Sequence, residues 1–287
     1  MTWRYIILIY LFLSLLLTAG CTEKNTTTTE TKNVQRTAPV DEFVVAGSGA
    51  NLHVTAKLAE AYCAKTGINI LVPGSIGSDG AINAVQSGSL EMGLISRPLT
   101  LNESATGLKE LPYARVAIVF ASHINASNSG FSAAEIIEIL AGSKTTWSDG
   151  TKIHVFIRQI KESSNLVLND TLPGYKEALF DAYESKRWQI VYRDSDMSEI
   201  FKQTKGAFGV SIGTEVAKEN SQIKALDYNG ISPTTANIRN GSYKLTEDLS
   251  FVYKDPLSSR ASKFLEYVFS EEGQRILDKW GTSPLGR

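Results

Sequence analysis

Short apolar runs alternate with amphipathic stretches along the chain from residue 41 onward. Compact apolar runs bounded by turn residues predict strands, and apolar residues spaced three or four apart predict helices. Strands are expected at 43–46, 68–72, 92–95, 115–121, 153–157, 206–213 and 249–253, and helices at 52–65, 81–87, 132–140 and 262–280. Because strands and helices alternate, the pattern predicts an α/β fold with helices on both faces of a sheet.

Three polar turns, at 47–51, 74–80 and 158–165, each follow a predicted strand and lead into a helix start. A helix start offers unpaired N–H groups and a partial positive charge, and glycine lets a ligand approach the backbone, so this combination is typical of an anion site. Such turns gather at the carboxyl ends of the strands in α/β sheets. Arg97 and Arg158 follow strands and would add guanidinium groups. The alternatives are ordinary helix capping for each turn, and a surface or interdomain salt bridge for either arginine.

The first residues form a separate segment. Arg4 precedes an apolar run over 5–17, and Leu17-Thr18-Ala19-Gly20-Cys21 follows, which is typical of an export signal. A Cys after Ala-Gly resembles the bacterial lipoprotein box, in which that Cys is acylated, so residues 1–20 are predicted to be a signal peptide and Cys21 the lipid anchor. Thr18 stands where the box usually has Leu, and an ordinary signal with an incidental Cys is the alternative. The Thr-rich residues 21–40 predict a flexible tether.

Composition and charge exclude several other classes. The chain is 43% hydrophobic and 21% charged, as in ordinary globular proteins, and its net charge of −1 argues against nucleic acid as a partner. If Cys21 is acylated, Cys63 has no disulfide partner and is expected to be a buried apolar side chain. The scattered histidines predict no metal site, and no nucleotide-binding or nucleophile-elbow motif is present, so no cofactor and no enzymatic activity are expected.

Several motifs resemble those of the phosphate-binding component of bacterial phosphate ABC importers, a type II periplasmic solute-binding protein. The resemblance covers about residues 41–287. It is carried by AGSGANL at 46–52, GSIGSDGAINAVQSGSLEMGLISRPL at 74–99, GAFGVSIG at 206–213, NGISPTTANIRNGSYKLTEDLSFVYK at 229–254 and SKFLEYVFSEEGQRILDKWGTSPL at 262–285.

The resemblance implies a two-domain α/β fold, with two mixed sheets flanked by helices and a ligand cleft between the lobes. Domain I would comprise 41–120 and 245–287, and domain II would comprise 121–244. Together with the turn chemistry, it makes the expected ligand contacts Ala50, Asn51, Leu52, Ser78, Ser96, Arg97, Arg158, Ser163, Ser164 and Asn165.

Two departures from the family pattern concern the ligand. Ser96 stands where phosphate binders often carry an Asp that accepts the proton of hydrogen phosphate, and Glu162-Ser163-Ser164-Asn165 replaces the usual Ser-Gly-Thr. Asp79 or Glu162 is expected to act as the missing proton acceptor. The alternative is that both are solvated capping residues.

The expected function is capture of phosphate or a related small oxyanion outside the cytoplasmic membrane and its delivery to an ABC permease. Binding would close the two lobes of a monomer around the anion. The alternatives are a different small anion, a sensor or adhesion lipoprotein of the same fold, and a hydrolase that acts through Ser48 or Ser78.

Overall fold

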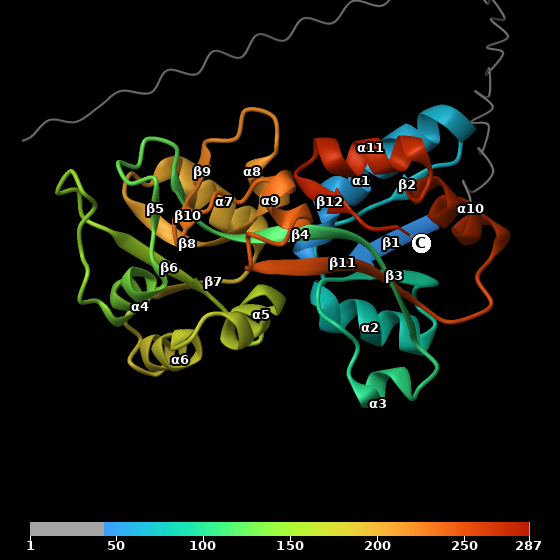
Figure 1. Ribbon diagram of the computed structural model, residues 1–287. Helices are drawn as coiled ribbons and strands as arrows, with labels where there is room; N and C mark the ends of the chain where they lie inside the picture. The colour runs from blue at the N-terminus through green and yellow to red at the C-terminus, as the bar shows by residue number, and fades with distance from the viewer. Residues whose placement is uncertain (1–42, 287) are drawn as a thin grey trace, which may run out of the picture. The chain divides into compact units, whose positions relative to one another are not determined.

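The central sheet is organised by two long antiparallel strands, β4 (Lys109–His123) and β11 (Thr246–Tyr253). They belong to a computed structural model that describes residues 43–286. Ten strands share one sheet, whose main path runs β2-β1-β3-β11-β4-β8-β6-β7, while β9 and β12 pair with β4. The sequence predicted two mixed sheets; here they are continuous, because β4 is long enough to pair in both halves (Figure 1).

The remaining strands divide between two lobes. The first lobe contains the parallel strands β1 (Phe43–Gly47), β2 (Ile70–Leu71) and β3 (Met92–Ile95). The second lobe contains β6 (His154–Arg158), β7 (Gln189–Val191) and β8 (Ala207–Ile212), which are also parallel to one another. The shorter strands are β5 (Gly130–Phe131), β9 (Ile223–Ala225), β10 (Asp227–Tyr228) and β12 (Thr282–Pro284).

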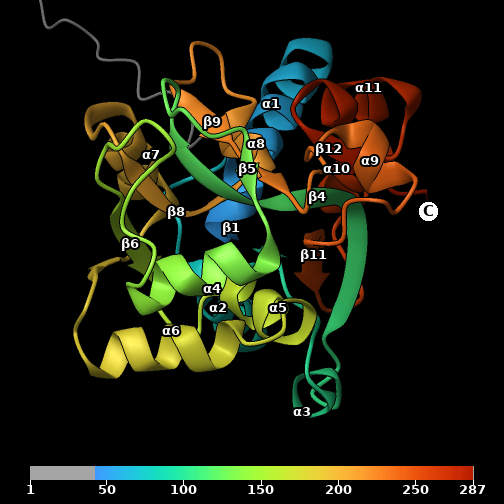
Figure 2. The ribbon, with the colours of Figure 1, turned by 60° about the vertical axis from the view of Figure 1, so that its left-hand side comes forward.

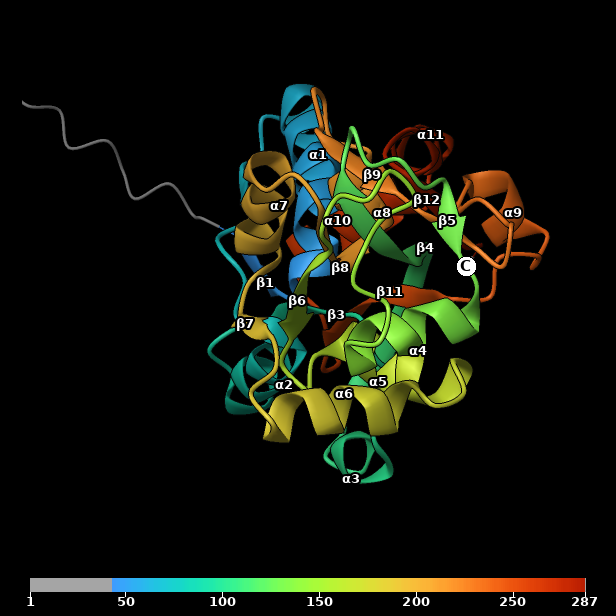
Figure 3. The same cartoon turned by 90° about the vertical axis from the view of Figure 1, so that its left-hand side faces the viewer.

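Helices cover both faces of the sheet in each lobe, as the alternating pattern predicted (Figures 1 and 2). In the first lobe α1, α10 and α11 lie on one face and α2 and α3 on the other, while in the second lobe α7 and α8 lie opposite α4, α5 and α6 (Figure 3). The helices are α1 (Gly49–Thr66), α2 (Gly77–Ser87), α3 (Leu101–Ser104), α4 (Ala133–Ala141), α5 (Ser163–Thr171), α6 (Tyr175–Glu184), α7 (Asp194–Gln203), α8 (Gly213–Val216), α9 (Thr235–Arg239), α10 (Ser259–Val268) and α11 (Glu271–Lys279).

The chain passes from one lobe to the other within β4. Ala117 pairs with Thr246 of β11, whereas the next residue, Ile118, pairs with Ile212 of β8. The return passage is fixed at the same level, because the Ile118 amide donates to the carbonyl of Leu245 at 2.8 Å. The predicted domain limits at 120 and 245 fall in β4 and immediately before β11, and they stay a prediction.

The C-terminal segment differs from the sequence prediction. A single helix was expected over 262–280, but the structure has α10 and α11 separated at Ser270. The Ser270 hydroxyl accepts the Gly273 amide and so begins a new helix, a local interaction that apolar periodicity does not reveal. The sequence also missed α6 and α7, whose charged surfaces weaken the apolar pattern.

The predictions for the two cysteines have different outcomes. Cys63, on α1, is only partly buried, so the expected full burial is wrong. Within residues 43–286 no helix is long and apolar enough to cross a membrane. Cys21, the predicted signal peptide and the tether lie outside the described residues.

Candidate functional site

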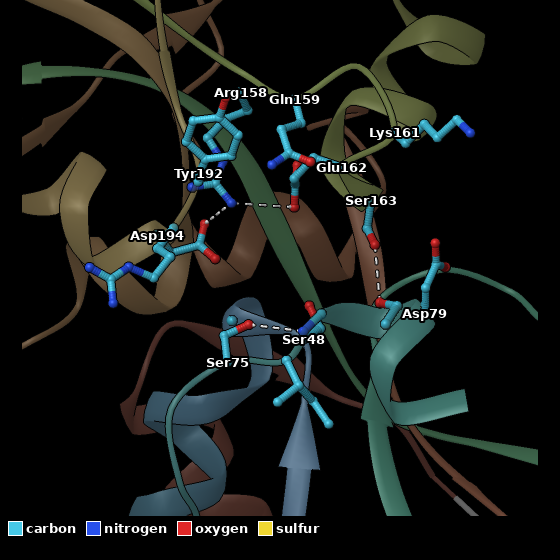
Figure 4. Close-up of a pocket in the computed structure, with 15 residues that line it drawn as sticks. Ser48, Ser75, Asp79, Arg158, Gln159, Lys161, Glu162, Ser163, Tyr192 and Asp194 are labelled. Carbon is cyan, nitrogen blue, oxygen red and sulfur yellow. Dashed lines mark hydrogen bonds and ion pairs between the residues drawn. The ribbon is translucent and has the colours of Figure 1, made fainter. Parts of the chain in front are cut away.

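A cavity of about 410 Å³ lies where the N-termini of α1, α2, α5 and α7 meet. The first two helices belong to the first lobe and the last two to the second, so the cavity is the cleft between the lobes (Figure 4). Its lining is mostly polar. The lining residues are Ser48, Gly49, Ser75, Ile76, Gly77, Ser78, Asp79, Arg158, Gln159, Lys161, Glu162, Ser163, Tyr192, Arg193 and Asp194.

Arg158 is the buried cation of this cavity. It is the last residue of β6, a mostly buried strand between β7 and β8, and only 5% of it is exposed. Its Nη2 lies 3.5 Å from Asp194 Oδ1 and 4.0 Å from Glu162 Oε1. Its Nε and Nη1 are buried and have no hydrogen-bond partner among the described residues. Because such donors are costly to leave unpaired, the guanidinium is suited to a further oxyanion.

Glu162 caps α5 with its own side chain. Its Oε2 accepts the Ser164 amide at 3.0 Å, and its other oxygen faces Arg158. Burial and the negative charge of Asp194 raise the pKa of Glu162 to about 7, although Arg158 opposes this rise. Glu162 is therefore a carboxyl group that changes its charge near neutral pH.

Asp194 places a second carboxylate at the start of α1. It is the first residue of α7, and a β-carbon on Gly49 would overlap its Oδ2. Glycine at this position lets the carboxylate approach the first turn of α1. Burial raises the pKa of Asp194, and the positive charge of Arg158 works against that rise.

Glu247 supplies a third carboxyl group, behind the cavity wall. It lies on β11, is buried, and its Oε2 accepts the Ser164 hydroxyl at 2.9 Å. Its Oε1 has no partner within residues 43–286. Burial, with the nearby charge of Glu162, raises its pKa well above the usual range, which favours the protonated form.

Serine hydroxyls join the turns at the base of the cavity. Ser78 and Ser163, from opposite lobes, are 3.1 Å apart between their hydroxyl oxygens. Ser78 Oγ also accepts the Ser96 amide at 3.1 Å, and Ser96 Oγ lies 2.8 Å from Ser48 Oγ. The three strand-end turns that the sequence singled out are therefore neighbours in space.

Two asparagines occupy matching places in the two lobes and do not line the cavity. Asn51 and Asn165 are each the third residue of a helix, and both are fully buried. Asn51 donates to the Ile95 carbonyl at 3.2 Å and accepts the Tyr113 hydroxyl at 2.7 Å. Asn165 donates to the Gln159 carbonyl and accepts the Tyr175 hydroxyl, both at 2.7 Å. Their amide groups tie a helix start to a strand end.

Arg97 and Asp79 form an ion pair at the rim. Arg97 Nη2 lies 2.6 Å from Asp79 Oδ1 and 2.8 Å from Glu103 Oε1. The guanidinium lowers the pKa of Glu103 to about 2. Arg97 does not line the cavity and has the salt-bridge arrangement that the sequence left open as its alternative. The Asp79 side chain is 72% exposed.

The other predicted contacts divide between the cavity and the layer behind it. Ser78, Asp79, Arg158, Glu162 and Ser163 line the cavity. Ser96 and Ser164 lie behind the lining: the Ser96 hydroxyl contacts Ser48, and the Ser164 hydroxyl donates to Glu247. The Ala50 carbonyl accepts the Thr214 hydroxyl, and Leu52 lines a neighbouring groove. The other predicted contacts that do not line the cavity are Arg97, Asn51 and Asn165.

Sequence reasoning missed Asp194 and Tyr192, which line the cavity with Arg158, and Glu247, which accepts the Ser164 hydroxyl behind the cavity wall. Asp194 was interpreted as part of a helix-capping turn, which is where it lies, but its approach to Arg158 depends on how β6 and β7 pair. Glu247 could have been found from the sequence. It interrupts an apolar strand pattern, and a charged side chain in a buried strand needs a partner.

The raised pKa values predict how stability depends on pH. A carboxyl group with a raised pKa in the folded state stabilises the protein below its unfolded pKa and loses that contribution as pH rises through the folded pKa. The urea midpoint of the ligand-free protein should therefore fall as pH rises from about 4.5 to about 7, the window set by Glu162. Glu103 acts below this window, because its pKa is about 2. His53, whose pKa is lowered by burial, contributes in the opposite direction within this window, so Glu162→Gln is the reference. The fall should be smaller in that variant, and an equal change of midpoint in both proteins would contradict this assignment.

Comparisons with known proteins give a family match and several relatives. A family model described as "PBP superfamily domain" matches residues 26–272. The phosphate-binding protein PstS 2 of Streptococcus agalactiae is 28% identical over 160 residues, and PstS of Borreliella burgdorferi is 24% identical over 217 residues. The matches cover 52% and 71% of this chain and 52% and 76% of the relatives, so the chain spans about half the length of the Streptococcus protein.

Solved structures share the fold. A Clostridium perfringens structure, described as a phosphate ABC transporter substrate-binding protein with bound phosphate, has a TM-score of 0.75 and 24% identity. The similarity covers 85% of this chain and 100% of that one. An ABC-type phosphate transport receptor from Vibrio cholerae has a TM-score of 0.60 and 17% identity, over 84% and 99% of the two chains.

Proposed function

Because this chain belongs to the PBP superfamily, we propose that it captures a small oxyanion, phosphate, outside the cytoplasm and delivers it to an ABC permease. The printed names of the relatives, which are phosphate-binding proteins, support phosphate as the ligand. The Clostridium structure of similar fold is described with phosphate bound. No bond is made or broken in this function.

The observation that carries the proposal is the state of Arg158. A guanidinium that is 5% exposed, with two unbonded nitrogens, lies beside the N-termini of α1 and α5. Backbone amides at helix starts and a guanidinium together replace the water that an oxyanion loses on binding. Because α1 and α5 belong to different lobes, the bound anion would hold the lobes together.

Carboxyl groups near the cavity bear on the protonation state of the ligand. We propose that Glu162, rather than Asp79, accepts the proton of hydrogen phosphate, because Glu162 faces Arg158 while Asp79 is exposed and paired with Arg97. A carboxylate beside a dianion is repulsive unless a proton lies between them. Phosphate has such a proton near neutral pH and sulfate does not.

Calorimetry with the two anions tests the proposed function. At about pH 8, where Glu162 is mostly ionised, phosphate should bind with a measurable enthalpy, and sulfate should bind about tenfold more weakly, because it has no proton to share with the carboxylate. Equal affinity for the two anions would contradict the acceptor role. Absence of binding of either anion would contradict the proposed function.

The placement of the protein follows from the same proposal. Acylation of Cys21 would anchor the chain to the membrane, and residues 21–40 would act as the tether to the binding unit. The protein would act as a monomer that closes on its ligand. The hydrolase alternative gains no support, since the hydroxyls of Ser48 and Ser78 bond to other serines rather than to a histidine.

A further inference from the structure

The start of α5 already holds a negatively charged group of the chain itself. Glu162 precedes the helix, and its carboxylate accepts the Ser164 amide at 3.0 Å. That amide is one of the donors that a helix start offers to an anion. The same carboxylate lies 4.0 Å from the guanidinium of Arg158. Glu162 therefore engages both groups that the proposed oxyanion needs.

The charges around Glu162 come from every element packed against it. Arg158 on β6 is the attractive charge, and Asp194 on α7 and Glu247 on β11 are repulsive. Tyr175 on α6 is fully buried, and its neutral hydroxyl bonds to Asn165. Lys161 is exposed and extends away from Arg158 (Figure 4). Two carboxyl groups, Glu162 and Asp194, thus share one buried guanidinium before any ligand arrives, and Glu247 lies behind them on the Ser164 hydroxyl.

We propose that Glu162 is an internal competitor for the oxyanion: its carboxylate occupies the α5 amide in the free protein and must release that amide to the ligand. The inference rests on the proposed function, because it concerns the same site. It makes Glu162 a specificity-determining residue. A ligand with a proton to share tolerates the displaced carboxylate nearby, while a full dianion meets its repulsion.

Protonation of Glu162 removes the competition. A neutral carboxyl group is a weaker helix cap and does not repel a dianion. Burial and the charge of Asp194 raise the pKa of Glu162 to about 7, so this change falls in the neutral range. Sulfate keeps its charge over this range, which makes it the suitable probe. Its affinity should therefore increase as the pH falls from about 8 to about 6.

Calorimetric titration with sulfate at several pH values tests the proposal on three proteins: the natural chain, Glu162→Gln and Glu135→Gln. Glutamine can still accept the Ser164 amide through its carbonyl oxygen, so the cap and the fold should be retained. Glu162→Gln should bind sulfate at least about tenfold more tightly at about pH 8 and lose most of the pH dependence. Its affinity for phosphate should change less.

Glu135→Gln is the matched control, because Glu135 also accepts a backbone amide at a helix start, that of Ser132 before α4, but lies outside the cavity. It should leave sulfate binding and its pH dependence unchanged. If Glu162→Gln binds sulfate no more tightly than the natural chain while phosphate still binds, the competitor role is wrong and the proposed function stands. If none of the three proteins binds phosphate or sulfate, the proposed function itself is wrong.

Discussion

Replacing Arg158 with alanine is expected to lower the affinity for phosphate at least about 100-fold, which corresponds to about 2.8 kcal/mol. The guanidinium is the buried cation of the cavity, and it faces two carboxylates, Asp194 and Glu162. Without it, the buried part of the cavity would offer an incoming anion carboxyl groups, serine hydroxyls and helix amides, because the other basic residues of the lining, Lys161 and Arg193, are exposed. Calorimetry on the natural chain and the variant measures the loss directly.

Arg158→Lys tests how much of the phosphate affinity depends on the positive charge of Arg158 and how much on the planar shape of its guanidinium. Lysine keeps the positive charge but cannot present the planar fork, so its phosphate affinity should lie between those of the natural chain and the alanine variant. It also leaves Asp194 and Glu162 with a cation nearby, so it should fold even if the alanine variant does not. Unchanged phosphate affinity in the lysine or the alanine variant would contradict the role given to Arg158.

Replacing Gly47 with alanine is expected to destabilise the protein by more than about 3 kcal/mol. Gly47 ends β1 and pairs with Leu94 of β3, and a β-carbon there would overlap the backbone carbonyl of Leu94. Backbone atoms in the middle of a sheet cannot move aside as a flexible side chain can. The clash therefore separates the two strands that position the first turn of the cavity.

Gly74→Ala is the matched control for this prediction. A β-carbon at Gly74 meets no atom within 4 Å, so the same substitution should change stability by less than about 0.5 kcal/mol. Urea unfolding of both variants provides the comparison. Similar midpoints for the Gly47 and Gly74 variants would show that the close approach of β1 and β3 does not constrain the fold.

The local part of the site could be predicted from the sequence. Ser78, Arg158 and Ser163 stand at strand ends or helix starts, where backbone geometry exposes amide groups and fixes the direction of the side chain. A turn of this kind is defined by its own residues, and apolar strands bring the carboxyl ends together at one edge of a sheet. For this reason, residues distant in the sequence were correctly expected to gather in one place.

The electrostatic part of the site could not be predicted in the same way. Asp194 reaches Arg158 from α7 and Glu247 reaches Ser164 from β11, through pairings that only the folded sheet defines. The side chains of Asn51 and Asn165 were equally ambiguous, because an asparagine at a helix start can bind a ligand or tie the chain to itself. Each side chain bonds to a backbone carbonyl and to a tyrosine hydroxyl, that of Tyr113 for Asn51 and that of Tyr175 for Asn165.

Glu162 could be predicted from the sequence in part. Its departure from the family pattern was visible in the sequence, and it led to the expectation of a proton acceptor at this turn. The sequence could not show that its carboxylate would turn back onto the Ser164 amide and face Arg158. Side-chain direction at a helix start depends on the charges around it, and those charges come from three other elements.

A crystal structure of the protein grown with phosphate tests the central claim most directly. The account predicts a tetrahedral anion in the cavity between the lobes, with its oxygens within hydrogen-bond distance of the Arg158 guanidinium and of backbone amides at the start of α5, and with Glu162 moved off the Ser164 amide. A saturated crystal in which this cavity holds no anion, or in which phosphate lies elsewhere and Arg158 keeps only its own carboxylates, would contradict it.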